Sequence, residues 1–223
     1  MKTVIFDLDG TLADTSGDLI AAANACFREM GVGDMLDAGR DAGTALRGGK
    51  AMLRLGLERL GAAEDAVIER WYPRLLEAYA EDIDRHTALY PGAMEAVETL
   101  RGAGFGVGIC TNKPEALAER LLRSLRVREA FASLVGADTL PQRKPDPEPL
   151  LEAARRAGGR PELTCLVGDS DTDRKTARAA GVPCILVTFG PSGEDMAALQ
   201  PEALIAAFGE LPGVVARLLA RGA

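Results

Sequence analysis

Residues 4–11 of this chain, with the sequence VIFDLDGT, decide both the fold class and the chemistry that the remaining sequence has to support. Three apolar residues, two of them β-branched, come first and predict a buried strand. Two carboxylates, Asp7 and Asp9, follow one residue apart, and a Gly-Thr turn ends the stretch. Carboxylates beside apolar residues cost free energy unless they are paired, so this placement indicates a metal ion, a transferred phosphoryl group or both. An acidic strand end with an ordinary turn is the alternative interpretation.

The composition is that of an ordinary globular protein. The chain has 223 residues, of which 47% are hydrophobic and 26% charged, enough to bury a sizeable core in one domain with or without a smaller insert. The formal net charge of −7 disfavours nucleic acid and anionic membranes as partners, because both favour basic surfaces. It is compatible with an anionic substrate in a locally positive pocket.

Cysteine usage and hydropathy favour a cytoplasmic protein. None of the four cysteines belongs to a CxxC pair, and each has small or apolar neighbours, which is typical of buried reduced thiols. Met1 and Lys2 lead directly into the first predicted strand rather than into a signal sequence. No apolar run approaches the roughly 18 residues that a membrane-spanning helix needs. We therefore expect no membrane partner. A monomer or a homodimer is expected.

The segment after the first strand predicts an inserted helical domain. Residues 12–87 contain no convincing strand, are rich in Ala, Leu, Arg and Glu, and place apolar residues at helical spacing. Leu60 belongs to one of the predicted apolar faces. We expect an α/β catalytic core formed by residues 1–14 and 88–223 and a helical cap formed by residues 15–87.

The second half of the chain alternates strands and helices. Apolar runs predict strands at 107–110, 133–135, 164–167 and 183–187, and the segments between them predict helices at 115–125, 150–157 and from 171 to 180. This alternation favours a Rossmann-like parallel sheet with helices on its faces. After residue 187 we expect a loop and one or two terminal helices, with no further strand.

Polar groups follow several of these predicted strands directly. Asp7 and Asp9 follow the first strand, Thr111 and Asn112 follow a later one, and residues 169–173 follow another. Lys144 begins a further loop. Ligands of open parallel sheets bind beyond the carboxyl ends of the strands, so these groups are expected to meet at one edge. Taken singly, each has a simpler interpretation as a helix cap or a turn.

Four motifs, in this order and spacing, resemble those of the haloacid dehalogenase superfamily. They are DLDGT at 7–11, TNKP at 111–114, KPDP at 144–147 and GDSxxD at 168–173. The resemblance covers nearly the whole chain and is greatest to the phosphoglycolate phosphatase-like branch, in which a helical cap is inserted just after the first motif.

The resemblance implies a two-step hydrolysis of a phosphate monoester. Asp7 would be the nucleophile that attacks phosphorus and forms an aspartyl-phosphate. Asp9 would protonate the leaving oxygen and then activate water. Mg²⁺ would be the cofactor, held by Asp7, the backbone carbonyl of Asp9 and Asp169, with Asp173 as a further ligand, directly or through water.

The remaining site residues implied by the resemblance are cationic or polar. The Lys144 ammonium would interact with the phosphoryl oxygens and with Asp7, and the Thr111 hydroxyl would complete the phosphate-binding site. Asn112 is a substrate-binding candidate. Lys113, next to it, either contacts substrate or is solvated at the start of a helix.

The cap offers two candidate substrate-binding residues. Arg47 and Lys50 flank a Gly-Gly turn, and caps of this superfamily commonly supply specificity from such a loop. A helix-joining loop with exposed charges is the alternative. We interpret His86, the sole histidine, as structural or exposed. Asp171 is interpreted as an exposed acid at a helix start rather than as a metal ligand.

These observations predict a Mg²⁺-dependent phosphomonoesterase that acts on a small phosphorylated metabolite, with 2-phosphoglycolate as the leading substrate. A β-phosphoglucomutase-like phosphotransferase and other sugar-phosphate or pyrophosphate hydrolases share these motifs. A haloacid dehalogenase is disfavoured because it needs no leaving-group acid such as Asp9. A phosphonate hydrolase would require a Schiff base on a cap lysine, for which Lys50 is the candidate. A phospho-accepting receiver-like signalling module is the alternative from another class.

Overall fold

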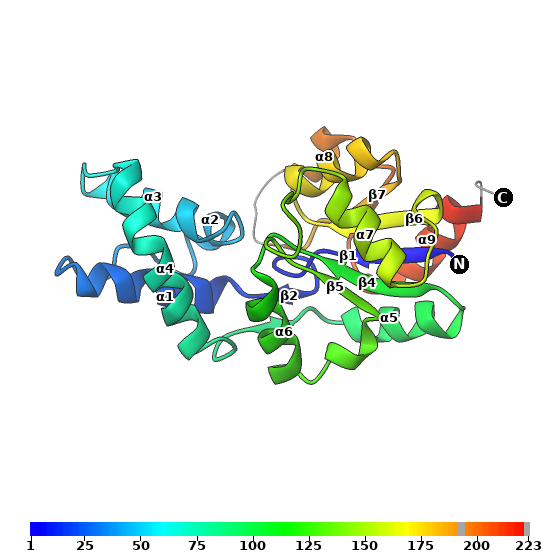
Figure 1. The fold of residues 1–223 in the computed structure, drawn as a ribbon, viewed down its shortest axis with the longest axis horizontal. Coiled ribbons are helices and arrows are strands. Elements are labelled where there is room, and N and C mark those ends of the chain that lie inside the picture. The colour runs from blue at the N-terminus through cyan, green and yellow to red at the C-terminus, as the bar shows by residue number, and fades with distance from the viewer. Residues whose placement is uncertain (191–194, 221–223) are drawn as a thin grey trace. The chain divides into compact units, whose positions relative to one another are not determined.

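The computed structural model describes residues 1–190 and 195–220 (Figure 1). The chain divides into two compact units. One consists of Met1–Ala13 together with Leu89–Ala223, and the other is the insert Asp14–Ala88. Two short strands, β2 (Ala13–Asp14) and β3 (Ala88–Leu89), form a separate two-stranded sheet where the chain passes between the units.

The first unit is built on a parallel sheet of six strands among the described residues. The strands are β1 (Thr3–Phe6), β4 (Gly106–Cys110), β5 (Ser133–Val135), β6 (Thr164–Gly168), β7 (Cys184–Val187) and β8 (Ala203–Ile205). Their spatial order is β5-β4-β1-β6-β7-β8, and every neighbouring pair is parallel. The predicted α/β fold with a parallel sheet is therefore confirmed, and β1 lies inside the sheet between β4 and β6.

Strand β8 was not expected from the sequence. It has three residues, lies at the edge of the sheet and leaves Leu204 38% exposed. Its pairing partners on β7 run from Ile185 opposite Ala203 to Val187 opposite Ile205. A short edge strand of Ala, Leu and Ile has no strong strand propensity of its own, so the ladder with β7 fixes its conformation.

Helices cover both faces of this sheet. They are α5 (Ala93–Gly102), α6 (Glu115–Ser124), α7 (Glu148–Arg156), α8 (Asp171–Ala180) and α9 (Leu211–Ala220), with short 3₁₀ turns at Arg128–Ala130, Pro161–Leu163, Met196–Leu199 and Phe208–Glu210. Helices α7 and α8 pack together over one face, and α5 and α9 pack together over the other (Figure 1).

The core under α7 and α8 is apolar. Ile5 and Leu166, on neighbouring strands, pack against Leu150, Ala153 and Ala177 of the two helices, and all five side chains are fully buried. Because successive residues of a strand point to opposite faces, Val4 and Phe6 lie on the other side, where they are also fully buried. Burial on both faces explains why a central strand such as β1 is a continuous apolar run.

The insert is helical, with α1 (Ser16–Glu29), α2 (Ala42–Ala45), α3 (Gly49–Arg59) and α4 (Asp65–Glu81). Gly56 of α3 lies against the ring of Phe27 of α1, and a Cβ atom at this position would be 2.1 Å from the Phe27 ring. Leu60 is 40% exposed, contrary to its expected place on an apolar face, because it follows the last residue of α3.

A buried carboxylate ties the two ends of the insert together. Asp18, near the start of α1, is 2% exposed. Its oxygens accept hydrogen bonds from the backbone N–H groups of His86 and Thr87 and from the Thr87 hydroxyl, at 2.7 to 3.0 Å. The His86 side chain is exposed, as interpreted from the sequence.

The four cysteines are buried thiols without a disulfide bond. Among the helices within 1–190 and 195–220, none has the length and apolar character required to cross a bilayer.

Candidate active site

The predicted site residues of the first unit lie at the carboxyl ends of neighbouring strands. Asp7 follows β1, Thr111 follows β4 and Asp169 follows β6, and these three strands are adjacent in the sheet. The Asp7 N–H donates to the Val167 carbonyl and the Thr111 N–H to the Val135 carbonyl, both at 2.9 Å. Sheet bonding thus continues one residue beyond the strand and fixes the backbone that carries each functional side chain.

Three carboxylates converge at this edge. Asp7, Asp169 and Asp173 each place an oxygen within 4.8 Å of the others. Asp169 is 3% exposed and Asp173 fully buried. Lys144 lies among them, with its Nζ atom 2.7 Å from Asp173 Oδ1 and 3.0 Å from Asp7 Oδ2. Its side chain is 1% exposed, so the ammonium is partnered by carboxylates in place of bulk water.

Burial and the neighbouring acids raise the pKa values of Asp7 and Asp169. Burial raises the pKa of Asp7 to about 6; the Lys144 charge opposes this shift, and Asp173 and Asp9 add to it. Burial and the neighbouring Asp173 and Asp7 charges also raise the pKa of Asp169 well above its ordinary value. Burial by itself would lower the pKa of Lys144, but the Asp173 and Asp7 charges outweigh it and raise that pKa.

The donor set suits a hard divalent cation. All three groups are carboxylates, they are close together, and one lysine balances only part of their charge. Oxygen ligands of this kind are those that Mg²⁺ prefers, and a cation would stabilise the ionised carboxylates against their mutual repulsion. Asp7, Asp169 and Asp173 therefore fit a magnesium site.

Hydroxyl groups hold two of these carboxylates in place. The Thr11 hydroxyl donates to Asp169 Oδ1 at 2.8 Å, and the Ser170 hydroxyl donates to Asp173 Oδ2 at 2.6 Å. Ser170 is also the N-cap of α8, since its Oγ accepts from the Asp173 N–H. Gly168 makes room for this arrangement, because a Cβ atom there would lie 2.4 Å from the Asp173 side chain.

Asp9 has different surroundings from Asp7. Its two carboxylate oxygens lie 2.8 and 2.9 Å from Lys113 Nζ, and its side chain is 16% exposed. Within the described residues, its carboxylate is not part of the three-acid cluster. The turn that carries it is closed by the Leu8 carbonyl, which accepts from the N–H groups of Leu12 and Ala13 at 3.0 and 3.1 Å. The sequence-based metal role of Asp9, through its backbone carbonyl, stays a prediction.

The loop after β4 carries the second motif. Thr111 is 3% exposed, and its hydroxyl oxygen accepts from the Lys113 N–H at 3.2 Å. The Asn112 side chain donates to the Lys144 carbonyl at 3.0 Å and so joins this loop to the loop that carries Lys144. The substrate-binding role of Asn112 stays a prediction, beside this structural one.

The two cap candidates belong to the insert. Arg47 follows α2, and Lys50 lies in the first turn of α3. Lys50 Nζ is 2.5 Å from Glu69 Oε1 and 5.1 Å from the centre of the Tyr72 ring. Both partners lie on α4, so Lys50 of α3 pairs with the neighbouring helix of the insert. Substrate contact by Arg47 and Lys50 stays a prediction.

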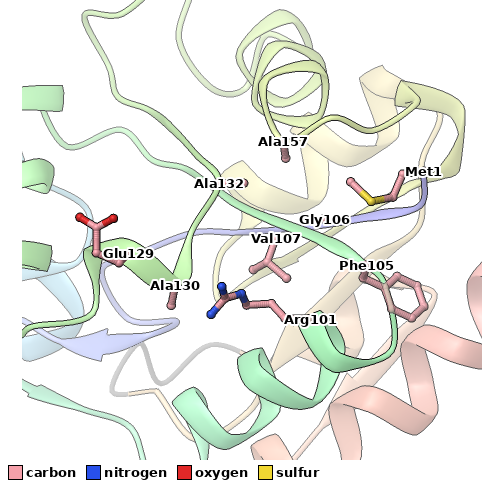
Figure 2. A pocket seen from close by; sticks show the side chains of 9 residues that line it. All are labelled: Met1, Arg101, Phe105, Gly106, Val107, Glu129, Ala130, Ala132 and Ala157. Carbon is pink, nitrogen blue, oxygen red and sulfur yellow. The ribbon is translucent and has the colours of Figure 1, made fainter.

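A cavity of about 270 Å³ lies elsewhere in the first unit. Figure 2 shows its lining, which includes Met1, Phe105 and Val107 at the amino-terminal end of β4. The acids lie beyond the carboxyl ends of the strands, so this cavity is not part of the candidate site.

Comparison with known proteins agrees with this geometry. The sequence model of the haloacid dehalogenase-like hydrolase family matches residues 4–187, a span that runs from β1 to the end of β7 and includes all four motifs. The chain belongs to the haloacid dehalogenase-like hydrolase family. The family predicted from the four motifs is therefore confirmed.

Curated relatives of this haloacid dehalogenase-like hydrolase match it over nearly its whole length. Phosphoglycolate phosphatase of Mesorhizobium japonicum is 37% identical over 227 residues, covering 99% of this chain and 97% of the relative. Phosphoglycolate phosphatase of Rhodospirillum rubrum is 38% identical over 216 residues, covering 94% of this chain and 89% of the relative. The resemblance to the phosphoglycolate phosphatase-like branch is confirmed.

Solved structures share the fold. A predicted phosphoglycolate phosphatase from Haemophilus somnus superimposes with a TM-score of 0.84 at 22% identity, covering 96% of this chain and 97% of the other. A haloacid dehalogenase-like family hydrolase from Streptococcus pneumoniae gives 0.75 at 23% identity, with 96% and 97% covered. At these identities the likeness supports the fold of the haloacid dehalogenase-like hydrolase.

Sequence reasoning left three contacts of this hydrolase site unassigned. The serine three residues before Asp173 forms an S-x-x-D pattern, a helix-start signal that identifies Ser170 as a cap. Thr11 gives no comparable signal, since its bond to Asp169 joins residues 158 apart in the chain. The pairing of Lys113 with Asp9 joins residues 104 apart, and it too depends on the tertiary fold.

Proposed function

We propose that this haloacid dehalogenase-like hydrolase is a Mg²⁺-dependent phosphomonoesterase whose substrate is 2-phosphoglycolate. The observation that carries the proposal is the cluster of Asp7, Asp169 and Asp173 around Lys144 at the carboxyl end of the sheet. The relatives named phosphoglycolate phosphatase, at 37% and 38% identity, support the choice of substrate.

Asp7 acts as the nucleophile in the first half of the reaction. A carboxylate oxygen of Asp7 forms a bond to phosphorus while the bond from phosphorus to the leaving oxygen breaks, and Asp9 donates a proton to that oxygen. Lys144, whose Nζ atom is 3.0 Å from Asp7 Oδ2, would bind the transferring phosphoryl oxygens together with the Thr111 hydroxyl.

The second half returns Asp7 to its initial state. Asp9, now a carboxylate, accepts a proton from water as the water oxygen attacks phosphorus. The bond between phosphorus and the Asp7 oxygen breaks, and inorganic phosphate leaves. Asp7, Asp169 and Asp173, with the Asp9 backbone carbonyl, would hold Mg²⁺, which when bound would supply positive charge that offsets the repulsion between the Asp7 carboxylate and the substrate phosphate.

Specificity for a carboxylated substrate requires cations near the leaving group. Arg47 and Lys50 of the cap are the residues we propose for this contact, because a guanidinium or an ammonium binds a carboxylate through charge-assisted hydrogen bonds. The same assignment predicts that a simple alkyl phosphate without a carboxylate is a poorer substrate.

A phosphate-release screen tests the proposal. The purified chain is incubated with Mg²⁺ and a panel containing 2-phosphoglycolate, sugar phosphates and pyrophosphate, and we expect 2-phosphoglycolate to give the highest kcat/KM. Asp7→Asn should abolish turnover. The matched control is Asp171→Asn, which changes a 47% exposed acid at the start of α8 and should leave activity within about twofold of the original.

Other outcomes identify the alternatives. Transfer of phosphate between sugar phosphates without net release would indicate a phosphotransferase. One equivalent of phosphate retained per chain, without turnover, would indicate a receiver-like module. Borohydride trapping of substrate on Lys50 would indicate a phosphonate hydrolase.

A further inference from the structure

A second buried lysine lies in this site, and its partner is Asp9. Lys113 has a side chain that is 3% exposed, and its Nζ atom lies 2.8 and 2.9 Å from the two oxygens of the Asp9 carboxylate. Burying an ammonium is costly unless it is paired and hydrogen-bonded. Contact with both oxygens fixes the direction in which the carboxylate points, which a single bond would not.

The backbone that carries Lys113 is braced at several points. Its N–H donates to the Thr111 hydroxyl oxygen at 3.2 Å, and its carbonyl accepts from the Ala137 N–H at 3.0 Å. The next loop also holds the start of α6, where the Glu115 N–H donates to Asp138 Oδ1 at 2.7 Å. A lysine held in this way presents its ammonium at a defined place.

The loop after β5 approaches this backbone closely at a glycine. A Cβ atom on Gly136 would lie 2.5 Å from the Glu115 nitrogen and 2.6 Å from its Cα atom. A larger residue at 136 would therefore displace the start of α6 and, with it, the loop that carries Lys113. The close packing at Gly136 therefore helps to fix the position of Lys113.

Each of the two acids of the first motif contacts a different buried lysine. Lys144 contacts Asp7 and Asp173, whereas Lys113 contacts Asp9. Asp7 and Asp9 are two residues apart, yet each has its own ammonium, delivered from a different loop. Such a division is expected if the two acids have different tasks and each must keep its own orientation.

We propose that Lys113 is a positioning residue that holds the carboxylate of Asp9 in the orientation needed for proton transfer to the leaving oxygen. The inference rests on the proposed function, in which Asp9 is the general acid. Proton transfer requires the donor within hydrogen-bond reach of the accepting oxygen, so a carboxylate that rotates away loses rate.

This role makes a prediction about leaving groups. An alkoxide is a poor leaving group that needs the proton from Asp9, whereas 4-nitrophenolate leaves as a stable anion and needs it little. Loss of orientation at Asp9 should therefore slow alkyl phosphates much more than 4-nitrophenyl phosphate. The measured quantity is kcat/KM, because it covers the steps up to release of the leaving group and excludes the later attack of water.

The experiment uses three substrates and the full chain with Mg²⁺. They are 2-phosphoglycolate, ethyl phosphate, which lacks a carboxylate, and 4-nitrophenyl phosphate. For Lys113→Met we expect kcat/KM to fall about 10- to 100-fold on both alkyl phosphates and less than about threefold on the aryl phosphate, since general acid catalysis contributes roughly 10²–10⁴-fold. Lys113→Arg keeps the positive charge and should recover part of the alkyl rate.

Asp9→Asn sets the reference for these values. It should show the same substrate pattern with a larger loss, and Lys113→Met should cause no further loss in its presence, because the two residues act as a unit. Lys175→Met, which changes a 63% exposed lysine, should leave all three substrates unaffected. Circular dichroism and thermal unfolding check that each variant is folded.

Each remaining outcome overturns a defined part of the argument. An equal loss on all three substrates in folded Lys113→Met would mean a general structural role. A loss confined to 2-phosphoglycolate would mean that Lys113 binds the substrate carboxylate. If Asp9→Asn spares the alkyl phosphates, the assignment of Asp9 within the proposed function fails, whereas an effect in Asp9→Asn without one in Lys113→Met overturns only the inference about Lys113.

Discussion

Asp7 and Lys144 form a buried ion pair, with 3.0 Å between the carboxylate Oδ2 and the ammonium Nζ. The same ammonium lies 2.7 Å from Asp173, which is fully buried. One lysine thus offsets part of the charge of two carboxylates at the centre of the site. Removing it would leave both acids without their cation, and the free-energy cost of an unpaired buried charge falls on the folded state alone.

Lys144→Met is therefore expected to destabilise the protein. The predicted loss is about 3–5 kcal/mol in the free energy of unfolding, the range found when one partner of a buried ion pair is removed. Urea unfolding in the presence of a chelator measures it. Lys175→Met is the control, since that side chain is 63% exposed and its loss should change stability by less than about 0.5 kcal/mol. Equal stability of the two variants would contradict the prediction.

The raised pKa of Asp7 predicts a pH dependence of stability in the absence of metal. Burial raises this pKa to about 6, above the value of about 4 expected in the unfolded chain. The folded state then binds more protons than the unfolded state between these pH values. The contribution of Asp7 to the free energy of unfolding is fully present below about pH 4 and is lost as pH rises through about 6.

Asp7→Asn isolates this contribution because the amide does not titrate. Relative to the original chain, the unfolding free energy of the variant should rise by about 3 kcal/mol between pH 4 and pH 7 when a chelator is present. Mg²⁺ should reduce the difference, because a cation stabilises the ionised carboxylate of the original chain, and its affinity should increase with pH over the same range. A difference that does not change with pH would show that Asp7 has an ordinary pKa.

Much of the architecture could be predicted from local sequence. The strands of the sheet other than β8 are buried on both faces, so they appear as continuous apolar runs, and the polar groups that follow β1, β4 and β6 mark the carboxyl edge. β8 escaped prediction because its pairing with β7, rather than its own propensity, fixes it. β2 has two residues and gives no periodic signal at all.

Only the site residues that belong to a sequence motif, or that directly follow a predicted strand, could be predicted from the sequence. The grouping of Asp7 with Asp169 and Asp173 follows from strand adjacency, which the alternating pattern implies. The contacts of Thr11 with Asp169 and of Lys113 with Asp9 join side chains more than 100 residues apart, and they depend on turn geometry and rotamers. Such contacts leave no spacing signature in the sequence.

Thr11 provides a test of how the carboxylates are held. Its hydroxyl donates to Asp169 Oδ1 at 2.8 Å, and the residue is fully buried. Thr11→Val keeps the shape and removes the donor, so Asp169 should lose its fixed orientation. Residues that hold a metal ligand typically contribute about 10- to 100-fold to metal affinity, and we expect a weakening of Mg²⁺ binding in that range.

The Mg²⁺ dependence of activity and calorimetric titration both measure this affinity. Thr11→Ser retains the hydroxyl and should bind Mg²⁺ within about threefold of the original, compared with the 10- to 100-fold loss in Thr11→Val. If the two variants weaken binding equally, the methyl group rather than the hydrogen bond is what Asp169 requires.

The insert contains an ion pair between the buried Asp41 and Arg59, whose side chain is 30% exposed. Asp41 is 4% exposed, and its two oxygens accept from the two terminal nitrogens of Arg59 at 2.6 and 2.8 Å. Arg59 also donates to the Met35 carbonyl, so it joins the end of α3 to the loop before α2. Arg59→Met should cost about 1–3 kcal/mol, because the buried Asp41 carboxylate would lose the Arg59 donors, although its Oδ2 would still accept from the Asp37 N–H at 2.8 Å.

The pH dependence of this loss identifies its cause. The hydrogen bond from Arg59 lowers the pKa of Asp41, and burial opposes that shift. Asp41 therefore stabilises the fold above its unfolded pKa of about 4, and the contribution is lost as pH falls through its lower folded value. The difference in unfolding free energy between Arg59→Met and the original chain should accordingly shrink at low pH.

Asp41→Asn should reduce the effect of Arg59→Met at neutral pH, because the charge that Arg59 pairs is then absent. An unchanged effect of Arg59→Met in that background would assign the stabilisation to packing of the arginine side chain instead.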